Sequence, residues 1–193
     1  MSCQLSERLI SAILGHIGRT VTDNRAKIRE YYDSLATSYE RLYGAEQARK
    51  HKEVLRLVGE SKFRVLFDIG CGTGALLGQL GQHASFIVGI DISAKMLRFA
   101  KTGSTQAEFV IAECSMLPFR DNTADCVISV SLLNSDRDHA LPEMGRVLKE
   151  GGTLLATVFR SDNAARWAMW PMRSLIAESA LTERETLLLA TKD

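Results

Sequence analysis

The sequence lacks paired cysteines and long apolar runs. Four cysteines occur among its 193 residues, and they form no CxxC pair: Cys3, Cys71, Cys114 and Cys126. This pattern argues against a disulfide framework or a zinc site and favours a reducing, cytoplasmic environment. No run of about 18 apolar residues occurs, so we expect no transmembrane helix. The N-terminus also lacks a basic segment followed by an apolar core, so it does not resemble a secretory signal.

The sequence has almost no net charge. It contains 24 Lys and Arg against 23 Asp and Glu, which gives a formal charge of +1. This balance argues against a polybasic membrane anchor or a nucleic-acid coat, although a local basic patch would still allow RNA as a substrate. Hydrophobic residues make up 46% of the chain, which is typical of a soluble globular domain with its own core.

The N-terminal third reads as helical. Apolar residues recur at helical spacing over 9–17, over 28–43 up to a bend or end at Gly44, and over 54–58 before Gly59. Basic residues between these positions, including Arg25 and Lys50, fit solvated helix faces, and His51 fits a packed or solvated position. These helices are too short to bury a core alone. We therefore predict that residues 1–60 form a helical cap or lid on the domain that follows.

From residue 61 to 193, apolar runs alternate with helical patterns. Strands are predicted over 64–70, 85–91, 107–113, 124–131, 153–159 and 186–191, with helices over 74–83, 93–101, 141–150, 163–170 and 172–179. Ser93 is placed to cap its helix, and Pro142 to begin one. This alternation predicts an α/β fold, a Rossmann-like, doubly wound and mostly parallel sheet.

A glycine-rich turn follows the first of these strands. Gly70, Gly72 and Gly74 let the backbone turn tightly and approach a ligand, at the strand end where open α/β sheets bind ligands. Asp91 ends the next strand and can accept hydrogen bonds from a ribose. The glycines allow either a dinucleotide or S-adenosylmethionine. Asp68, just before the first glycine, would repel a pyrophosphate and attract the ammonium of S-adenosylmethionine, so it favours the second.

Five segments in order resemble a class I S-adenosylmethionine-dependent methyltransferase, nearest to the ubiquinone and menaquinone biosynthesis group. They read DIGCGTG, GIDIS, ECSMLPF, DCVISVSLL and RVLKEGG, and the resemblance runs from about Tyr31 to Phe159. It implies S-adenosyl-L-methionine as cofactor, methyl transfer as activity, and the strand order 3-2-1-4-5 followed by one C-terminal strand. In the family a helix and an antiparallel strand pair follow the fifth strand. Only residues 160–193 remain here, so we expect an incomplete wall on that side.

The resemblance also assigns residues to the cofactor. At the methionine end, Asp68 would take the ammonium, and the turn would line the methionine and ribose through Gly70, Cys71, Gly72 and Gly74.

At the adenosine end, Asp91 would hold the ribose, Ile92 would pack on adenine, and Glu113 and Cys114 would contact its polar edge. Glu113 stands where the family usually has Asp. Ser131 and Leu132 would lie near the sulfonium, and Tyr39 would close over the cofactor.

The residues leave the methyl acceptor open. A small molecule is favoured over RNA or protein, no metal is implied, and no catalytic residue is fixed, although Asn134, Asp136 and His139 follow the fourth strand. Two other functions stay open: an inactive, methyltransferase-like protein that acts through a partner, and a nicotinamide-dependent oxidoreductase.

A partner is suggested by the third strand, which should form an edge of the sheet with no proline or lysine to protect it. The segment YGAEQARKH faintly resembles methyltransferases that work with a small zinc-binding activator. A strand from a second copy of the chain could pair with the same edge.

Overall fold

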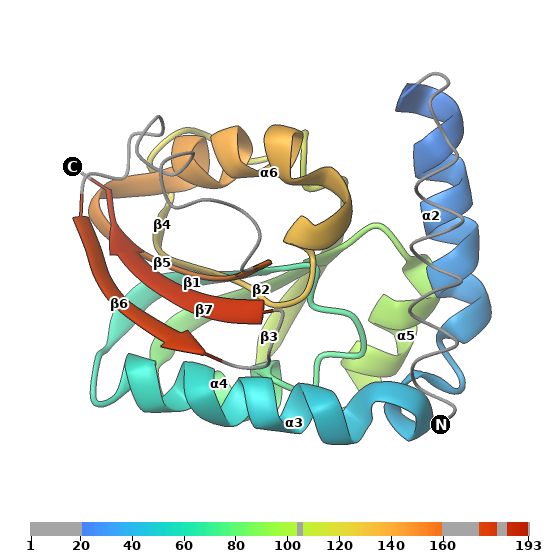
Figure 1. Cartoon of the computed structure of the whole chain (residues 1–193), viewed down its shortest axis with the longest axis horizontal. Helices are drawn as coiled ribbons and strands as arrows, with labels where there is room; N and C mark the ends of the chain where they lie inside the picture. The colour runs from blue at the N-terminus through green and yellow to red at the C-terminus, as the bar shows by residue number, and fades with distance from the viewer. Residues whose placement is uncertain (1–20, 104–105, 160–173, 181–184, 193) are drawn as a thin grey trace.

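The protein folds around one twisted sheet with helices on both faces (Figure 1). The computed structural model describes residues 21–103, 106–159, 174–180 and 185–192. Seven strands are hydrogen-bonded in the order β3-β2-β1-β4-β5-β7-β6. Their bounds are β1 Phe63–Ile69, β2 Ala84–Asp91, β3 Ala107–Ile111, β4 Ala124–Ser129, β5 Leu148–Phe159, β6 Ser174–Ala180 and β7 Glu185–Thr191.

The first five strands are parallel, as the sequence predicts, and their order is the predicted 3-2-1-4-5. β7 is the predicted C-terminal strand and runs antiparallel to β5. The prediction of a helix over 172–179 is wrong where the structure describes it, because β6 pairs antiparallel with β7. A short apolar run fits either element, and pairing with a neighbour decides between them. The expected incomplete wall is therefore also wrong: an antiparallel strand pair closes this side.

Helices cover the two faces of the sheet (Figure 1). Their bounds are α2 Val21–Leu35, α3 Tyr39–Val58, α4 Leu77–Leu80, α5 Ala94–Gly103 and α6 Leu133–Val147. α6 packs on β4 and β5, whereas α3 and α4 lie on the opposite face. Two predicted boundaries are wrong: α6 contains Pro142 instead of starting there, and α4 is far shorter than 74–83. Gly74, at φ +75°, still belongs to the turn, which delays the start of α4.

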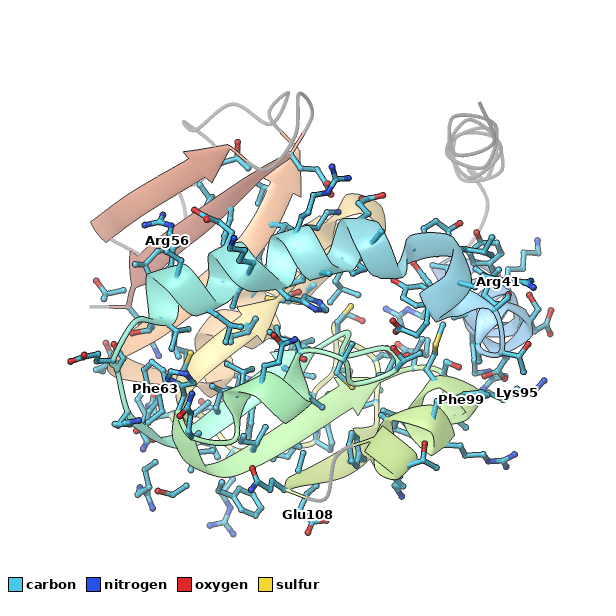
Figure 2. The ribbon with its side chains drawn as sticks, turned by 90° about the horizontal axis from the view of Figure 1, so that it is seen from below. Arg41, Arg56, Phe63, Lys95, Phe99 and Glu108 are labelled. Carbon is cyan, nitrogen blue, oxygen red and sulfur yellow. The ribbon has the colours of Figure 1, made fainter. Side chains whose placement is uncertain are left out.

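The two N-terminal helices meet at a turn over 36–38, where the Ser38 N–H donates to the Leu35 carbonyl at 2.8 Å. Gly44 lies inside α3, so a helix end at this residue is wrong. The predicted end at Gly59 is confirmed, and this residue has φ +56°. Figure 2 shows α3 crossing the face of the sheet, with the exposed Arg41 near its start and the exposed Arg56 near its end. The helix predicted over 9–17 lies outside the described residues.

The sheet separates two hydrophobic clusters. Along β1, Phe67 and Ile69 belong to the cluster under α6, whereas Leu66 belongs to the cluster under α3 and α4. Side chains alternate between faces in a strand, so Asp68 points to the same side as Leu66. The strand period thus places a carboxylate under α3, at the carboxyl end of β1.

Candidate functional site

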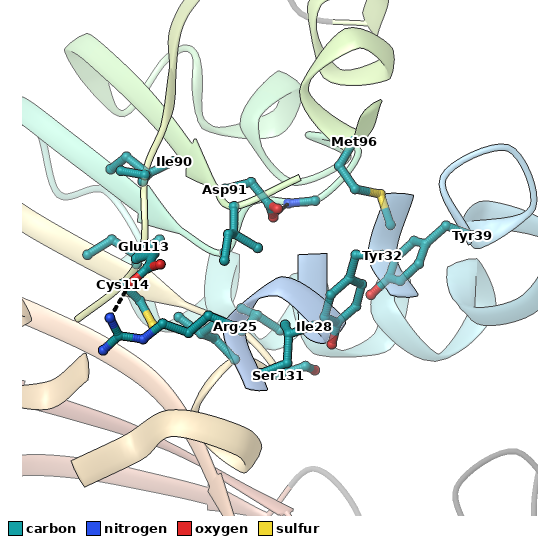
Figure 3. A pocket seen from close by; sticks show the side chains of 17 residues that line it. Arg25, Ile28, Tyr32, Tyr39, Ile90, Asp91, Met96, Glu113, Cys114 and Ser131 are labelled. Atoms are coloured by element: carbon teal, nitrogen blue, oxygen red, sulfur yellow. Dashed lines mark hydrogen bonds and ion pairs between the residues drawn. The ribbon is translucent and has the colours of Figure 1, made fainter. Parts of the chain in front are cut away.

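A cavity, here called the main cavity, opens where the central strands end (Figure 3). Helix α2 and the start of α3 cover it with Arg25, Ile28, Tyr32 and Tyr39. Eight of the predicted site residues line it: Tyr39, Gly70, Gly72, Asp91, Ile92, Glu113, Cys114 and Ser131. Leu132 lies there too. Helices, strand ends and turns that are far apart in the sequence therefore meet in one place.

A second hollow, the loop cavity, adjoins the first and shares Tyr39, Gly70, Gly72 and Val130 with it. It lies between the glycine turn and α3, and it is lined by two more predicted residues, Asp68 and Cys71. Gly74 lines neither cavity. A Cβ on Gly74 would lie 2.8 Å from the Ala100 Cβ, so this glycine lets the turn pack against α5.

Asp68 is a buried carboxylate with no compensating partner. Its side chain is 3% exposed, and no hydrogen bond or ion pair joins its carboxylate to another described residue. Burial, and then the nearby Asp91 carboxylate, raise the pKa of Asp68 to about 7. A buried polar group normally has a partner, because losing water without one is costly. The arrangement therefore suits a ligand that brings a cation to this position.

Asp91 joins the glycine turn to the start of α5. Its Oδ2 accepts from the Gly72 N–H at 2.9 Å and its Oδ1 from the Ser93 N–H at 2.8 Å. Burial raises the pKa of Asp91, and these backbone hydrogen bonds oppose that rise. The predicted cap by Ser93 is confirmed, because its Oγ accepts from the Met96 N–H at 3.1 Å. Asp91 thus faces the cavity while fixing the loop that shapes it.

The glycine turn leaves room for a ligand at one position. Gly72 has φ +54°, and a Cβ built on it would meet nothing within 4 Å. Because Gly72 lines both cavities, a side chain there would project into the shared space. The residues present therefore fit a ligand that lies against the turn.

Glu113 forms an ion pair with Arg25 of helix α2, a contact that the sequence did not predict. Its Oε2 lies 2.8 Å from Arg25 Nη1, and Arg25 Nη2 donates to Ser115 Oγ at 3.1 Å. Figure 3 shows Arg25 reaching from α2 toward Glu113 across the cavity. Reading Arg25 as part of a solvated face was therefore wrong. Nothing in the local pattern of α2 shows that one of its basic residues has a partner in the third strand's loop.

Ser131 follows β4 in a left-handed backbone conformation, at φ +63°. Its Oγ accepts from Lys50 Nζ at 2.9 Å and from Gln47 Nε2 at 3.3 Å, and its N–H donates to Thr157 Oγ1 at 2.6 Å. Lys50 is only 3% exposed, so reading it as part of a solvated face was also wrong. The sequence did not predict that Lys50 and Gln47 belong to the site, because lysine and glutamine side chains on a helix normally face solvent.

Tyrosines from helices α2 and α3 line one side of the main cavity. Tyr32 and Tyr39 both line it, and only Tyr39 was predicted to do so. Burial is the main cause that raises the pKa of both phenols, that of Tyr32 to about 12, and the nearby Asp91 carboxylate adds to it. Both hydroxyls therefore remain protonated at neutral pH.

Several predicted residues lie outside what the structure describes. The side chains of Asn134, Asp136 and His139 are among these, as are the predicted helix over 163–170 and Cys3. Across the described residues, Cys71 and Cys126 are free thiols, and no cluster of ligating side chains could hold a metal ion. In this same part of the chain, no helix has the length and apolar character needed to cross a membrane.

The model of a family described as "Methyltransferase domain" matches residues 67–156, which contain the glycine turn, Asp91 and Glu113. A ubiquinone/menaquinone biosynthesis C-methyltransferase of Acidiphilium cryptum is 31% identical over 84% of this chain and 71% of its own length. The chain belongs to the class I S-adenosylmethionine-dependent methyltransferases. The family predicted from the five sequence segments is therefore confirmed, and the nicotinamide-dependent alternative is not supported.

Other relatives extend the comparison. An uncharacterised protein of Methanocaldococcus jannaschii is 37% identical over 68% of this chain, which spans about half (51%) of that relative. Among solved structures, a magnesium protoporphyrin IX methyltransferase of Synechocystis with bound S-adenosylmethionine aligns with TM-score 0.73, 17% identity, and coverage of 91% and 100%. A putative methyltransferase of Haloferax volcanii, in complex with the Trm112 activator, aligns with TM-score 0.70, 18% identity, and coverage of 83% and 97%. These structures share the fold.

Proposed function

We propose that this protein binds S-adenosylmethionine along both cavities and transfers its methyl group to a small molecule. The observation that carries the proposal is Asp68: a buried carboxylate beside the glycine turn, without a cationic partner among the described residues. The methionine ammonium would supply that partner. The adenosine would extend into the main cavity, where Asp91 can accept from ribose hydroxyls and Glu113 from the adenine amino group.

Methyl transfer from a sulfonium asks little chemistry of the protein. The leaving group is neutral, so the enzyme mainly aligns the acceptor with the methyl group and excludes water. α2 and the start of α3 would provide the exclusion, because they cover the main cavity. Names of relatives suggest the first acceptors to test: demethylated quinol precursors in the biosynthesis of ubiquinone and menaquinone.

The experiment compares binding and turnover in one preparation. Calorimetry with S-adenosylmethionine, S-adenosylhomocysteine and NAD should show binding of the first two only. Asp91→Ala should weaken this binding by roughly 1–3 kcal/mol, because it removes acceptors for the ribose and frees the glycine turn. Asp125→Ala is the matched control: Asp125 also accepts a backbone N–H, that of Val65 at 2.7 Å, but lines neither cavity.

A turnover assay distinguishes an active methyltransferase from an inactive, methyltransferase-like protein. Transfer of radiolabelled methyl to a demethylated quinol, or to a small molecule of a cell extract, is expected. Label that enters only RNA or protein would contradict the small-molecule acceptor, and binding of NAD in place of S-adenosylmethionine would overturn the proposed cofactor.

We also propose that a small activator protein docks on the free edge of β3. Among the described strands, β3 pairs only with β2, and the Haloferax neighbour of the same fold was solved with such an activator. Ile111 at the end of β3 is 62% exposed and Met116 just beyond it is 70% exposed. An added strand would pair the open edge, and apolar contacts would cover these side chains.

Co-purification with a Trm112-type activator tests this docking. Ile111→Lys should abolish the complex while leaving the fold intact, because its side chain is exposed. Leu42→Lys is the control, since Leu42 is also half exposed (52%) but belongs to helix α3 and not to the edge strand. An active monomer that ignores the activator would contradict the proposal, and so would a dimer of this chain that Ile111→Lys separates.

A further inference from the structure

Helix α3 turns a row of polar side chains toward the loop cavity. Tyr39, Glu40, Gln47 and His51 all line it, opposite the glycine turn. His51 comes one helical turn after Gln47, and residues four apart share a helix face. This face of α3 covers the side of the sheet to which Asp68 points, so α3 and β1 contribute polar groups to the same hollow.

His51 differs from its neighbours because its ring forms no hydrogen bond with another described residue. Glu40 accepts a short hydrogen bond from the Thr73 hydroxyl, and Gln47 donates to Ser131. His51 is 8% exposed, yet no hydrogen bond joins its ring to another described residue. A side chain that is more than nine-tenths buried, polar and open to a cavity indicates a ligand that supplies its partner.

The loop cavity therefore contains two unmatched polar groups of complementary kinds. The Asp68 carboxylate can only accept when ionised, and an imidazole offers at least one N–H donor. Burial lowers the pKa of His51, and the charges nearby are the Glu40 carboxylate and the Lys50 ammonium. The ring is then neutral near pH 7 and keeps one donor. A ligand that satisfies both groups has an ammonium and an acceptor anion close together, as an α-amino acid has.

We propose that His51 donates a ring N–H to the carboxylate of the methionine moiety of S-adenosylmethionine, opposite Asp68. This inference rests on the proposed function and adds the residue that recognises the acid end of the cofactor. α3 then has two roles: it closes the loop cavity, and it selects ligands with a complete amino-acid end.

The test uses two cofactor forms that differ only in that carboxylate. Calorimetry is performed with S-adenosylmethionine and with decarboxylated S-adenosylmethionine, which keeps the ammonium. His51→Ala should bind S-adenosylmethionine at least about tenfold more weakly, the usual effect of losing a hydrogen bond to a charged group. Its affinity for the decarboxylated form should stay within about twofold of the wild-type value. His51→Asn, which keeps an N–H donor, should recover part of the loss.

The matched control is His83→Ala. His83 is also 8% exposed, but its Nδ1 lies 3.4 Å from the Ser61 carbonyl oxygen and it lines neither cavity. This variant should bind both ligands as the wild type does. Equal losses for both ligands in His51→Ala, or no loss for either, would overturn the inference. If the wild-type protein bound neither ligand, the proposed function itself would fail. Circular dichroism checks that each variant is folded. If His51→Ala does not fold, the two ligands are compared with His51→Asn instead.

Discussion

Asp68 is the residue whose titration affects both stability and binding. Its folded-state pKa is about 7, whereas an unperturbed Asp has 3.8. Between these values the folded chain holds a proton that the unfolded chain has released, so the free energy of unfolding falls as pH rises from about 4 to about 7. Asp68→Asn removes this dependence. Without cofactor, we expect it to be more stable than the wild type at about pH 8, by on the order of 3 kcal/mol, and equal to it at about pH 4.

Urea unfolding at the two pH values measures that difference, and binding gives the second readout. The affinity of the wild type for S-adenosylmethionine should increase as pH rises toward 7, because an ionised Asp68 attracts the ammonium. Asp68→Asn should bind more weakly and lose this pH dependence. A variant that is no more stable than the wild type at about pH 8 would show that Asp68 is compensated in the folded protein.

Substituting Gly72 distinguishes the cost of backbone strain from the steric exclusion of the cofactor. Gly72→Val should abolish cofactor binding, because its side chain enters the cavity, while costing roughly 1–2 kcal/mol of stability from the left-handed backbone. Gly151 is a matched control: it has φ +72°, and a Cβ there also meets nothing within 4 Å. Gly151→Val should lose similar stability in thermal unfolding yet bind S-adenosylhomocysteine normally in calorimetry. Equal binding by both variants would remove the turn from the cofactor site.

At the residue scale, the sequence predicts the groups that lie at strand ends. Asp68 and Asp91 lie at the carboxyl ends of β1 and β2, and Gly72 and Glu113 follow β1 and β3. The carboxyl ends of parallel strands meet at one edge of the sheet. Lys50 could not be predicted in the same way, because its partners are brought to it only by folding. A polar residue on a predicted helix is expected to face solvent unless the surface that packs against it is known. The residues that α3 contributes to the site were therefore missed.

At the element scale, α2 is joined to the domain at two points. Arg25 pairs with Glu113 near its start, and Asp33 near its end accepts from the Ser93 hydroxyl at 2.5 Å and from the Lys95 N–H at 3.2 Å. Both points adjoin the main cavity or the start of α5. The structure therefore suggests how α2, as part of the predicted lid, would be fastened, with the turn over 36–38 as its hinge.

Hydrogen exchange tests whether α2 moves. We expect its amides to exchange about tenfold more slowly when S-adenosylhomocysteine is bound, because a lid that opens for the ligand stays closed over it. Asp33→Ala should speed this exchange without ligand, and amides of β1 serve as the internal reference. Exchange in α2 that is the same with and without ligand would indicate a fixed cap.

The elements differ in how far local sequence determines them. β1, β2 and β4 are predicted because buried parallel strands read as continuous apolar runs. β6 is not, because Leu175 to Ala177 fits a helix as well as a strand until its pairing with β7 is known. The break between α2 and α3 was misplaced because a glycine is tolerated inside a long helix, whereas residues 36–38 carry no strong helix-stopping signal.

At the scale of the whole molecule, Lys50 joins three distant parts of the chain. Its Nζ lies 2.8 Å from Glu46 Oε1 on α3, 2.7 Å from Glu185 Oε2 on β7, and 2.9 Å from Ser131 Oγ after β4. The C-terminal strands are thereby tied to the N-terminal helix and to the wall of the main cavity. Such a buried ion pair does not by itself imply high stability, but removing the Lys50 ammonium takes a buried cation away from two carboxylates, which is costly.

Lys50→Met should therefore destabilise the fold by about 3–5 kcal/mol near neutral pH, measured by urea unfolding. Arg56→Ala is the control on the same helix, because the Arg56 side chain is 61% exposed and its ion pair with Glu53 should contribute less than about 1 kcal/mol. Adding Glu185→Leu to Lys50→Met should recover part of the loss, since it removes one of the carboxylates left behind. A single Lys50→Met variant as stable as Arg56→Ala would mean that the C-terminal strands are held by their apolar contacts alone.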